Sequence, residues 1–506
     1  MVVVPGLSMD QELLARIDGL QHYEERQLTL LMLLRMPNTR PVFVTSTPID
    51  PVIIDYYLNL LPGVPHPHAR RRLTLLSAYD ASGVTLTRKI LERPRLLARL
   101  RAAIGDPAIA HLSCFNATAA ERELALALDI PLYACDPELA SLGSKSGGRA
   151  LFRDCGVPLA DGIEDLRDGT DVIAALAELR TRDPGLRRAV VKLNDGASGE
   201  GNAIFDFAGA PAGGAALANW LAAQLPVRLR FEAPGELWEH YVTKLAQMGG
   251  IVEAWLGADD EAGAVAAGGA DVAGGADVAG GADVAGGAGG AAAGRARVRS
   301  PSVQLRITPT QELEVISTHD QVLGGLTGQK FLGSSFPADG AYRLELQELG
   351  RRVGEALRAR GALGRFSVDF VSRPRAGGGW DHRAIEINLR KGGTTHTFQT
   401  LQYLTGGRYD ESSGEFRVPG GSARVYYATD NLQRDAYRRL TPEDLVDVAV
   451  EQDLHFDQTL LEGVTFNLIG ALAEFGKLGV VAIGASPQRA RELYAHTVAV
   501  LDRASA

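Results

Sequence analysis

The sequence predicts an α/β fold that begins with a doubly wound parallel sheet. Short apolar runs alternate with amphipathic helical stretches between residues 41 and 133, which is the order of strands and crossover helices in such sheets. Hydrophobic residues make up 45% of the chain and charged residues 22%, the balance of an ordinary globular protein. The 506 residues are enough for about three to four domains and a sizeable core.

The elements of this first part follow in order along the chain. The segment before Pro41 carries a helical pattern, which Pro37 and Pro41 bring to an end. Thr118 as N-cap, with Glu121 three residues later, supports the start of the last helix in this part. Strands are expected at 41–45, 73–76, 109–112 and 131–133, and helices at 53–61, 86–104 and 118–128.

The composition excludes several classes of protein. The 61 acidic and 52 basic side chains leave a net charge of −9, and the longest basic run is only Arg70–Arg72, which argues against a nucleic-acid partner. No apolar run is long enough to span a bilayer, so we expect no membrane partner and a cytoplasmic location. Cys114, Cys135 and Cys155 form no CxxC pair and fit buried, reduced thiols.

A low-complexity tract interrupts the middle of the chain. Residues 257–294 contain 13 of the 58 glycines, and the hexad GGADVA occurs three times between 268 and 285. Three such copies offer too little apolar area to offset the ordering of the backbone. We therefore expect residues 257–299 to form a disordered insertion in a surface loop.

Two later strands carry the strongest chemical signal. After expected strands at 303–307 and 314–317 and a helix at 344–360, strands at 366–371 and 384–388 would direct Asp369, Glu386 and Asn388 to one side if they pair. These side chains offer oxygen ligands, which Mg²⁺ prefers. An acidic, solvated sheet face remains the alternative interpretation.

A second signal is a lysine-bearing strand followed by a glycine-rich loop. Residues 189–193 deliver Lys192, and Gly196, Gly199 and Gly201 follow, whose backbone amides would close over phosphate oxygens. Lys145, earlier in the chain, would add a second positive charge. The alternatives are a simple turn and solvated lysines.

Taken in order, these segments resemble an ATP-grasp fold. The stretches 249–253, 300–304, 317–321 and 386–396 resemble the pheganomycin-type peptide ligases, a branch of the ATP-grasp carboxylate–amine ligases, and the similarity runs from about 41 to 506 without the repeat tract. The resemblance implies an N-terminal doubly wound α/β domain, a central small α+β lid domain, a C-terminal α+β ATP and metal domain, and an extra C-terminal domain. The expected boundaries are 1–137, 138–256, 300–405 and 406–506, with the insertion at 257–299.

The resemblance also implies roles for individual residues. Lys145 and Lys192 would contact the phosphates of ATP, Glu253 the exocyclic amine of adenine, and the backbone of Ala254 and Leu256 the edge of the base. The glycine-rich loop would cover the phosphates through Gly196, Ser198, Gly199 and Gly201.

The remaining roles concern metal and substrate. Asp369, Glu386 and Asn388 would hold two Mg²⁺ ions, with Mn²⁺ as an alternative ion. Arg390 and Arg306 would neutralise the transferring phosphoryl group, although a solvated arginine is the alternative for Arg306. His319 or Asp320 would take the proton of the amine or orient the substrate. The other expected substrate contacts are Gln321, Gly392, Gly393, Thr394 and His396.

These roles imply an ATP-dependent ligase that joins an amino acid or peptide carboxylate to an amine through an acyl phosphate. Its partners would be small amino acid or peptide substrates, in specialised peptide or amino-acid metabolism, with a homodimer as one candidate assembly. Two alternatives stay open: a small-molecule kinase of the ATP-grasp type, and a nucleotide-binding regulatory module without turnover.

Overall fold

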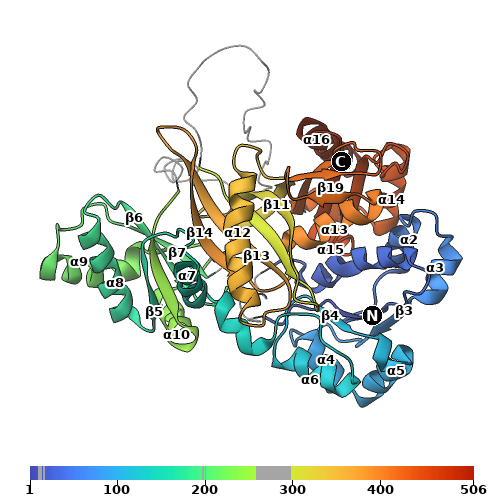
Figure 1. Ribbon diagram of the computed structural model, residues 1–506, viewed down its shortest axis with the longest axis horizontal. Helices are drawn as coiled ribbons and strands as arrows, with labels where there is room; N and C mark the ends of the chain where they lie inside the picture. The colour runs from blue at the N-terminus through green and yellow to red at the C-terminus, as the bar shows by residue number, and fades with distance from the viewer. Residues whose placement is uncertain (10–13, 15–16, 197–198, 200, 258–297) are drawn as a thin grey trace, which may run out of the picture.

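The computed structural model of the protein describes residues 1–9, 14, 17–196, 199, 201–257 and 298–506 (Figure 1). Three sheets carry the architecture: a parallel sheet near the N-terminus, a small antiparallel sheet, and a large antiparallel sheet in the centre. The expected repeat insertion lies almost entirely outside the described residues, and so does Ser198.

The first sheet is parallel and has the strand order β3-β2-β1-β4, which confirms the predicted doubly wound start of the chain. Its strands are β1 Val2–Val4, β2 Val42–Thr45, β3 Thr74–Ser77 and β4 Leu112–Cys114. Its helices are α2 Pro51–Asn59, α3 His66–Arg72, α4 Leu86–Leu91, α5 Pro94–Ile104 and α6 Ala119–Leu128.

The structure corrects several details of this first part. Strand β1 was not predicted, although it lies inside the sheet between β2 and β4. The helical pattern before Pro41 contains a 3₁₀ helix, η1, at Leu20–Arg35. The expected helix 86–104 is divided before Pro94, because proline lacks the N–H that continues a helix. The capping box of Thr118 and Glu121 is present as predicted.

The small sheet has five antiparallel strands in the order β5-β9-β6-β7-β8. They span β5 Gly162–Leu166, β6 Arg188–Leu193, β7 Asn202–Asp206, β8 Arg230–Phe231 and β9 Gly250–Ala254. The accompanying helices are α7 Lys145–Asp154, α8 Gly169–Arg182, α9 Gly214–Arg228 and α10 Trp238–Met248. This sheet and its helices form the left-hand lobe of Figure 1.

The large sheet has eight antiparallel strands in the order β14-β13-β10-β11-β12-β17-β19-β18. They span β10 Pro301–Ile307, β11 Leu313–Gly324, β12 Lys330–Phe336, β13 Gly364–Pro374, β14 Trp380–Asn388, β17 Val425–Gln433, β18 Gly463–Asn467 and β19 Lys477–Gly484. The helices of this part are α12 Arg343–Arg358, α13 Gly393–Thr405, α14 Pro442–Glu451, α15 Ala471–Phe475 and α16 Pro487–Ala504. A short hairpin follows α13, formed by β15 Arg408–Asp410 and β16 Glu415–Arg417.

The large sheet passes through the expected boundary between residues 405 and 406, because β17 pairs with β12 on one side and β19 on the other. One core cluster also joins the two ends of the chain, packing Leu28 and Leu31 of η1 with Val480 and Ile483 of β19. The expected domain boundaries therefore stay predictions, and the C-terminal strands belong to the same sheet as the predicted metal residues.

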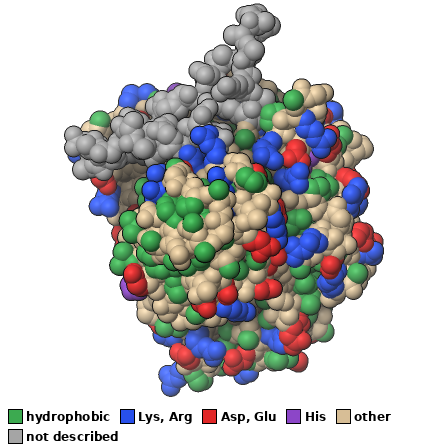
Figure 2. Space-filling model, turned by 90° about the vertical axis from the view of Figure 1, so that its left-hand side faces the viewer, with side chains coloured by type: hydrophobic (Ala, Val, Ile, Leu, Met, Phe, Trp, Pro, Cys, Tyr) green, Lys and Arg blue, Asp and Glu red, His purple; other side chains and the backbone are tan. Residues whose placement is uncertain are grey.

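The surface gives no sign of a single dominant charge on the face shown in Figure 2, where acidic and basic side chains are interspersed. Within the described part of the chain, every helix is too short or too polar to span a bilayer.

Candidate active site

A cavity of about 1090 Å³ lies between the small sheet, the large sheet and the N-terminal segment. Most of the residues predicted from the sequence to form the site line this cavity. They are Lys192, Gly199, Glu253, Ala254, Leu256, Asp320, Gln321, Asp369, Glu386, Asn388, Arg390, Gly392, Gly393 and Thr394.

The acidic residues come from the strand pair β13 and β14. These strands are antiparallel, with Asp369 opposite Glu386 and Ser367 opposite Asn388, so the expected pairing is present. The Asn388 side-chain amide donates to Asp369 Oδ2 at 3.1 Å. The register shifts directly after Asp369, and such irregularities re-aim side chains at a site.

The two carboxylates have different electrostatic surroundings. Burial, together with the charge of Glu386, raises the pKa of Asp369 to about 7. Burial acts on Glu386 in the same direction, but the nearby positive charges, with Lys145 foremost, hold the pKa of Glu386 below its ordinary value. Two half-buried carboxylates and an amide oxygen on one face form a donor set that fits Mg²⁺, which commonly takes one or two carboxylates and shares substrate phosphates.

Lys145 begins helix α7 and its Nζ lies 2.7 Å from Glu386 Oε1. The helix start is fixed by Ser144, whose hydroxyl accepts from the Gly147 amide at 3.1 Å. The Lys145 amide donates to the carbonyl of Asn194, directly after β6. These contacts place Lys145 against the acidic pair, next to the cavity.

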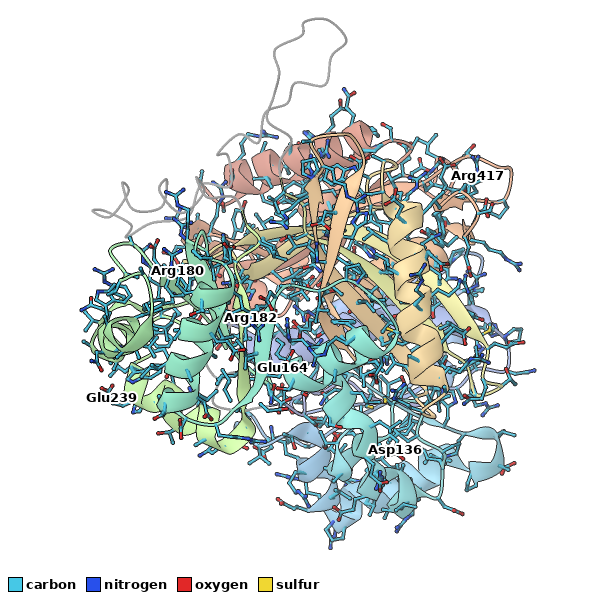
Figure 3. The ribbon with its side chains drawn as sticks, turned by 60° about the vertical axis from the view of Figure 1, so that its left-hand side comes forward. Asp136, Glu164, Arg180, Arg182, Glu239 and Arg417 are labelled. Atoms are coloured by element: carbon cyan, nitrogen blue, oxygen red, sulfur yellow. The ribbon has the colours of Figure 1, made fainter. Side chains whose placement is uncertain are left out.

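Lys192 lies on β6 and pairs with Glu253 on the neighbouring strand β9. Arg149 of α7 binds the other oxygen of Glu253 at 3.0 Å and also binds Glu164, which is labelled in Figure 3. Both oxygens of Glu253 therefore already contact cations. Arg149 was missed in the sequence, because its only signal was a charged residue on the buried face of a helix.

The glycine-rich loop connects β6 and β7, which form an antiparallel hairpin. Gly199 has φ +87°, and a Cβ there would lie 2.9 Å from the carbonyl oxygen of Gln329, near the turn between β11 and β12. Gly199 lines the cavity, whereas Gly196 and Gly201 do not. The predicted contact of Ser198 lies outside the described residues.

Asp320 and Gln321 lie on β11 and line the cavity. Asp320 accepts from the Tyr342 hydroxyl at 2.6 Å and from the Asp339 amide at 2.9 Å, and burial raises its pKa. The side chain of Gln321 lies near Asp369 and acts to lower the pKa of that carboxyl, against the larger effect of burial. Gly392, Gly393 and Thr394, at the start of helix α13, also line the cavity, so the N-terminus of this helix faces it.

Besides Lys145, Gly196 and Gly201, three further predicted residues do not line this cavity, and their contacts lie elsewhere. Arg306 pairs with Glu314 on the adjacent strand. His319 is completely buried, its Nε2 lies 2.6 Å from the Tyr426 hydroxyl, and burial lowers its pKa to about 3. In this structure His319 is thus a neutral histidine enclosed in the core, away from the large cavity.

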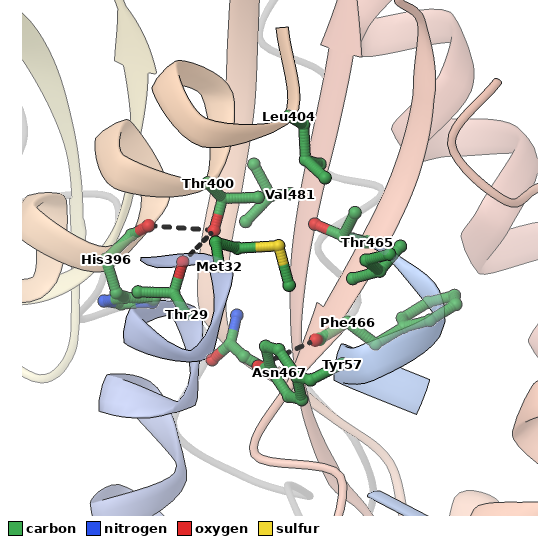
Figure 4. Close-up of a pocket in the computed structure, with 11 residues that line it drawn as sticks. Thr29, Met32, Tyr57, His396, Thr400, Leu404, Thr465, Phe466, Asn467 and Val481 are labelled. Atoms are coloured by element: carbon green, nitrogen blue, oxygen red, sulfur yellow. Dashed lines mark hydrogen bonds between the residues drawn. The ribbon is translucent and has the colours of Figure 1, made fainter. Parts of the chain in front are cut away.

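His396 is the third of these residues. Its Nε2 lies 3.1 Å from Asp430 Oδ1, and it lines a separate small cavity of about 10 Å³ (Figure 4). In that cavity Thr400 donates to the His396 carbonyl and contacts Thr29 of η1. His396 therefore lies behind the wall of the large cavity and is connected to it through Asp430, which pairs with Arg26.

Several residues of the cavity wall were missed in the sequence. They are Leu7, Tyr23, Arg26, Phe115, Asn202, Arg299, Ser302, Gln304 and Asn431. Ser302 and Gln304 lie in the stretch 300–304 that carries the family resemblance, and this was the one signal that could have identified them. The others come from segments far apart in the chain that only the tertiary fold brings together.

Similarity to known proteins agrees with this geometry. A family model described as "IQCH-like, ATP-grasp" matches residues 137–219 and 284–412, and one described as "PGM1 C-terminal domain" matches 444–497. The chain is 29% identical over 496 residues to the L-propargylglycine–L-glutamate ligase of Streptantibioticus cattleyicolor, covering 97% of this chain and 91% of that protein.

Two further similarities are more distant. The IQ motif-containing protein H of Danio rerio is 23% identical over 413 residues, which are 73% of this chain and 35% of that protein. The structure of N5-carboxyaminoimidazole ribonucleotide synthetase in its ADP complex superposes with a TM-score of 0.50 at 11% identity, covering 95% of this chain and 96% of that one. This structural likeness shows the fold.

Proposed function

Because this chain is an ATP-grasp carboxylate–amine ligase, we propose that it joins two amino acids, or an amino acid and a peptide, through an amide bond that forms in its large cavity. The relative that covers 97% of the chain is named for a ligation of two amino acids, and this supports the same class of substrate here. The name also supports a place in specialised peptide metabolism.

The observation that carries this proposal is the convergence of Lys145, Asp369, Glu386 and Asn388 beside a cavity large enough for a nucleotide and substrates. We place the phosphates of ATP over Lys145 and Lys192, under the loop of Gly199. The base would lie at the end of β9, against the backbone of Ala254 and Leu256. In the structure Lys145 pairs with Glu386 and Lys192 pairs with Glu253. When ATP binds, its phosphate oxygens would replace these carboxylates as the partners of the two lysines.

Asp369, Glu386 and Asn388 would hold the metal, which we propose to be two Mg²⁺ ions. Bound there, the ions would neutralise the charge that develops on the transferring phosphoryl group. Arg390 lies on the same side of the cavity, where the charges of Glu386 and Asp369 act on it. Its guanidinium would orient the phosphoryl group and the donor carboxylate.

The reaction balances in two steps. An oxygen of the donor carboxylate attacks the γ-phosphorus of ATP, the bond to the β–γ bridging oxygen breaks, and ADP leaves. A neutral amine then attacks the acyl carbon, the bond to the phosphate oxygen breaks, and inorganic phosphate leaves while the nitrogen loses one proton. The protein supplies position and charge in both steps, so no protein nucleophile is needed.

The test is a matrix of the twenty amino acids offered in pairs, with ADP release as the trigger and mass spectrometry of the products. We expect ADP release with a mass equal to the two amino acids less one water. With the donor alone and hydroxylamine, we expect the donor hydroxamate. A released phosphorylated product without amide would indicate a kinase, and nucleotide binding without any ADP release would indicate a regulatory module; either result contradicts the proposal.

A further inference from the structure

We propose that Arg26 and the apolar residues beside it form a subsite for the free carboxylate of the amine-supplying amino acid, whose side chain is apolar. This inference rests on the proposed ligase function. It adds to that function the chemical class of one substrate and the residue that recognises it.

Arg26 extends from η1 into the cavity, and its side chain is 12% exposed. Its Nη2 lies 2.8 Å from Asp430 Oδ2, and its guanidinium lies 3.8 Å from the centre of the Tyr23 ring. The buried Nε has no hydrogen-bond partner among the described residues. A buried donor without a partner is costly, and a guanidinium is shaped to take a carboxylate on two donors.

The contacts of Asp430 fix the orientation of Arg26. Asp430 is 2% exposed and is also bound by His396 on helix α13. Burial alone would raise the pKa of Asp430, but the charges of Arg26 and His396 outweigh burial and lower it, so the carboxylate stays ionised. Arg26 is therefore held in one direction before a substrate arrives, and little ordering is left for binding.

Arg26 is distinct from the arginine that we place at the reacting carboxylate. Arg390 lies at the acidic pair and its guanidinium lies 5.8 Å from the ring of Phe115, whereas Arg26 is paired to Asp430 at the N-terminal wall. The reacting carboxylate must lie beside Glu386 and Arg390, where the phosphoryl group would be transferred. A carboxylate at Arg26 is thus one that survives the reaction, as the carboxylate of the amine-supplying amino acid does.

The wall next to Arg26 is apolar. Leu7 and Ile17 pack with Tyr23 in one cluster, and all three line the cavity together with Phe115. A charged side chain placed against this wall would lose its hydration without gaining a partner. The wall therefore selects an apolar side chain for the amino acid that Arg26 holds.

The experiment compares L-leucine with L-leucinamide as the amine, using a donor found in the pair screen. In the wild type, we expect kcat/KM to favour leucine over its amide by roughly 10- to 100-fold, the usual value of a charged hydrogen-bonded pair. In Arg26→Gln we expect the KM for leucine to rise, so that the preference for leucine over leucinamide is lost. Arg26→Lys should retain part of this preference. The matched control is Arg35→Gln, an exposed arginine of the same helix, which we expect to keep the full preference.

A second readout separates this inference from the proposed function. Hydroxamate formation from the donor alone should fall less in Arg26→Gln than ligation of leucine does, because Arg26 is paired with Asp430, whereas Arg390 lies with Glu386 and Asp369. The double variant Arg26→Gln/Asp430→Asn removes the unpaired charge and tests for damage to folding. An unchanged preference in both variants, or a change confined to the KM of the donor, would overturn the inference even if ligation itself is established.

Discussion

Glu386 lies where the positive charges of the site meet. Lys145 contacts it, and the charges of Arg390 and Lys192 also lower its pKa against the effect of burial. Such a carboxylate stays ionised at neutral pH and is therefore ready to bind a cation together with Asp369 and Asn388.

Replacing Glu386 with Gln should consequently abolish turnover while the chain still folds. We expect ADP release to fall by roughly 100-fold or more, the usual effect of removing a charge that stabilises the transition state. Steady-state ADP release at saturating ATP measures the change, and circular dichroism melting monitors the fold. Glu314→Gln is the matched control, because Glu314 pairs with Arg306 outside the cavity. Equal losses in both variants would contradict the assignment.

His319 gives a prediction of a different kind. Its pKa in the folded chain is about 3 because it is buried, below the ordinary 6.5. Between these two pH values the unfolded chain binds more protons than the folded chain. The contribution of His319 to the free energy of unfolding is therefore complete above pH 6.5 and is lost as the pH falls toward 3. At pH 5 this loss is about 2 kcal/mol for an unfolded pKa of 6.5.

We therefore expect His319→Gln to lose less unfolding free energy than the wild type between pH 7 and pH 5, measured by urea titration at both values. Its ligation rate at pH 7.5 should stay within a few-fold of the wild type, because His319 does not line the cavity. A rate that collapses while the stability profile is unchanged would restore a catalytic role for this histidine.

At the scale of elements, the hairpin β6–β7 brings its loop to the turn that precedes β12. Gly199 has φ +87° and closely approaches the backbone of Gln329. We expect Gly199→Ala to raise the KM for ATP, since alanine is strained at this φ and its Cβ meets a carbonyl oxygen. Initial-rate kinetics over a range of ATP concentrations measure this.

The matched control is Gly209→Ala. Gly209 follows the same hairpin with a similar φ of +78°, but a Cβ there meets nothing within 4 Å. Both variants carry backbone strain, and only Gly199 adds a steric contact near the cavity. If both raise the KM for ATP equally, general strain in the hairpin explains the effect.

Some elements of this fold were predictable from the sequence, and others were not. The β13–β14 pair was predictable because Asp369, Glu386 and Asn388 alternate with apolar residues in two short strands. Strand β1 was not, because Val2–Val4 alone does not distinguish a strand from any other short apolar run. The roles of Arg149 and Arg26 depend on their partners Glu253 and Asp430, which are distant in the chain, and no local pattern encodes such pairs.

At the scale of the whole molecule, the large sheet makes the C-terminal part inseparable from the rest. β17 is hydrogen-bonded between β12 and β19, and the rings of Phe336 on β12 and Tyr426 on β17 stack with their centroids 5.1 Å apart. A chain ending at residue 405 would expose the edge of β12 and much of the core cluster that joins both termini.

We expect the 1–405 chain to be insoluble or to melt without cooperativity, measured by circular dichroism and size-exclusion chromatography beside the full chain. Addition of residues 406–506 as a separate fragment during refolding should recover soluble protein if the missing strands are the cause. A monomeric 1–405 chain with a sharp melting transition would show that residues 406–506 are an independent domain.

The origin of the cavity wall has a consequence for how relatives of this protein diverge. The acidic pair and the lysines lie within the stretches 137–219 and 284–412 that match the ATP-grasp family model. Tyr23, Arg26 and Phe115 precede those stretches, and Asp430 follows them. The subsite that we propose for the amine-supplying amino acid is thus separate in sequence from the residues that we propose for phosphate and metal. On this proposal, substitutions near both ends of the gene would change the preference for the amine without altering the residues assigned to phosphate and metal.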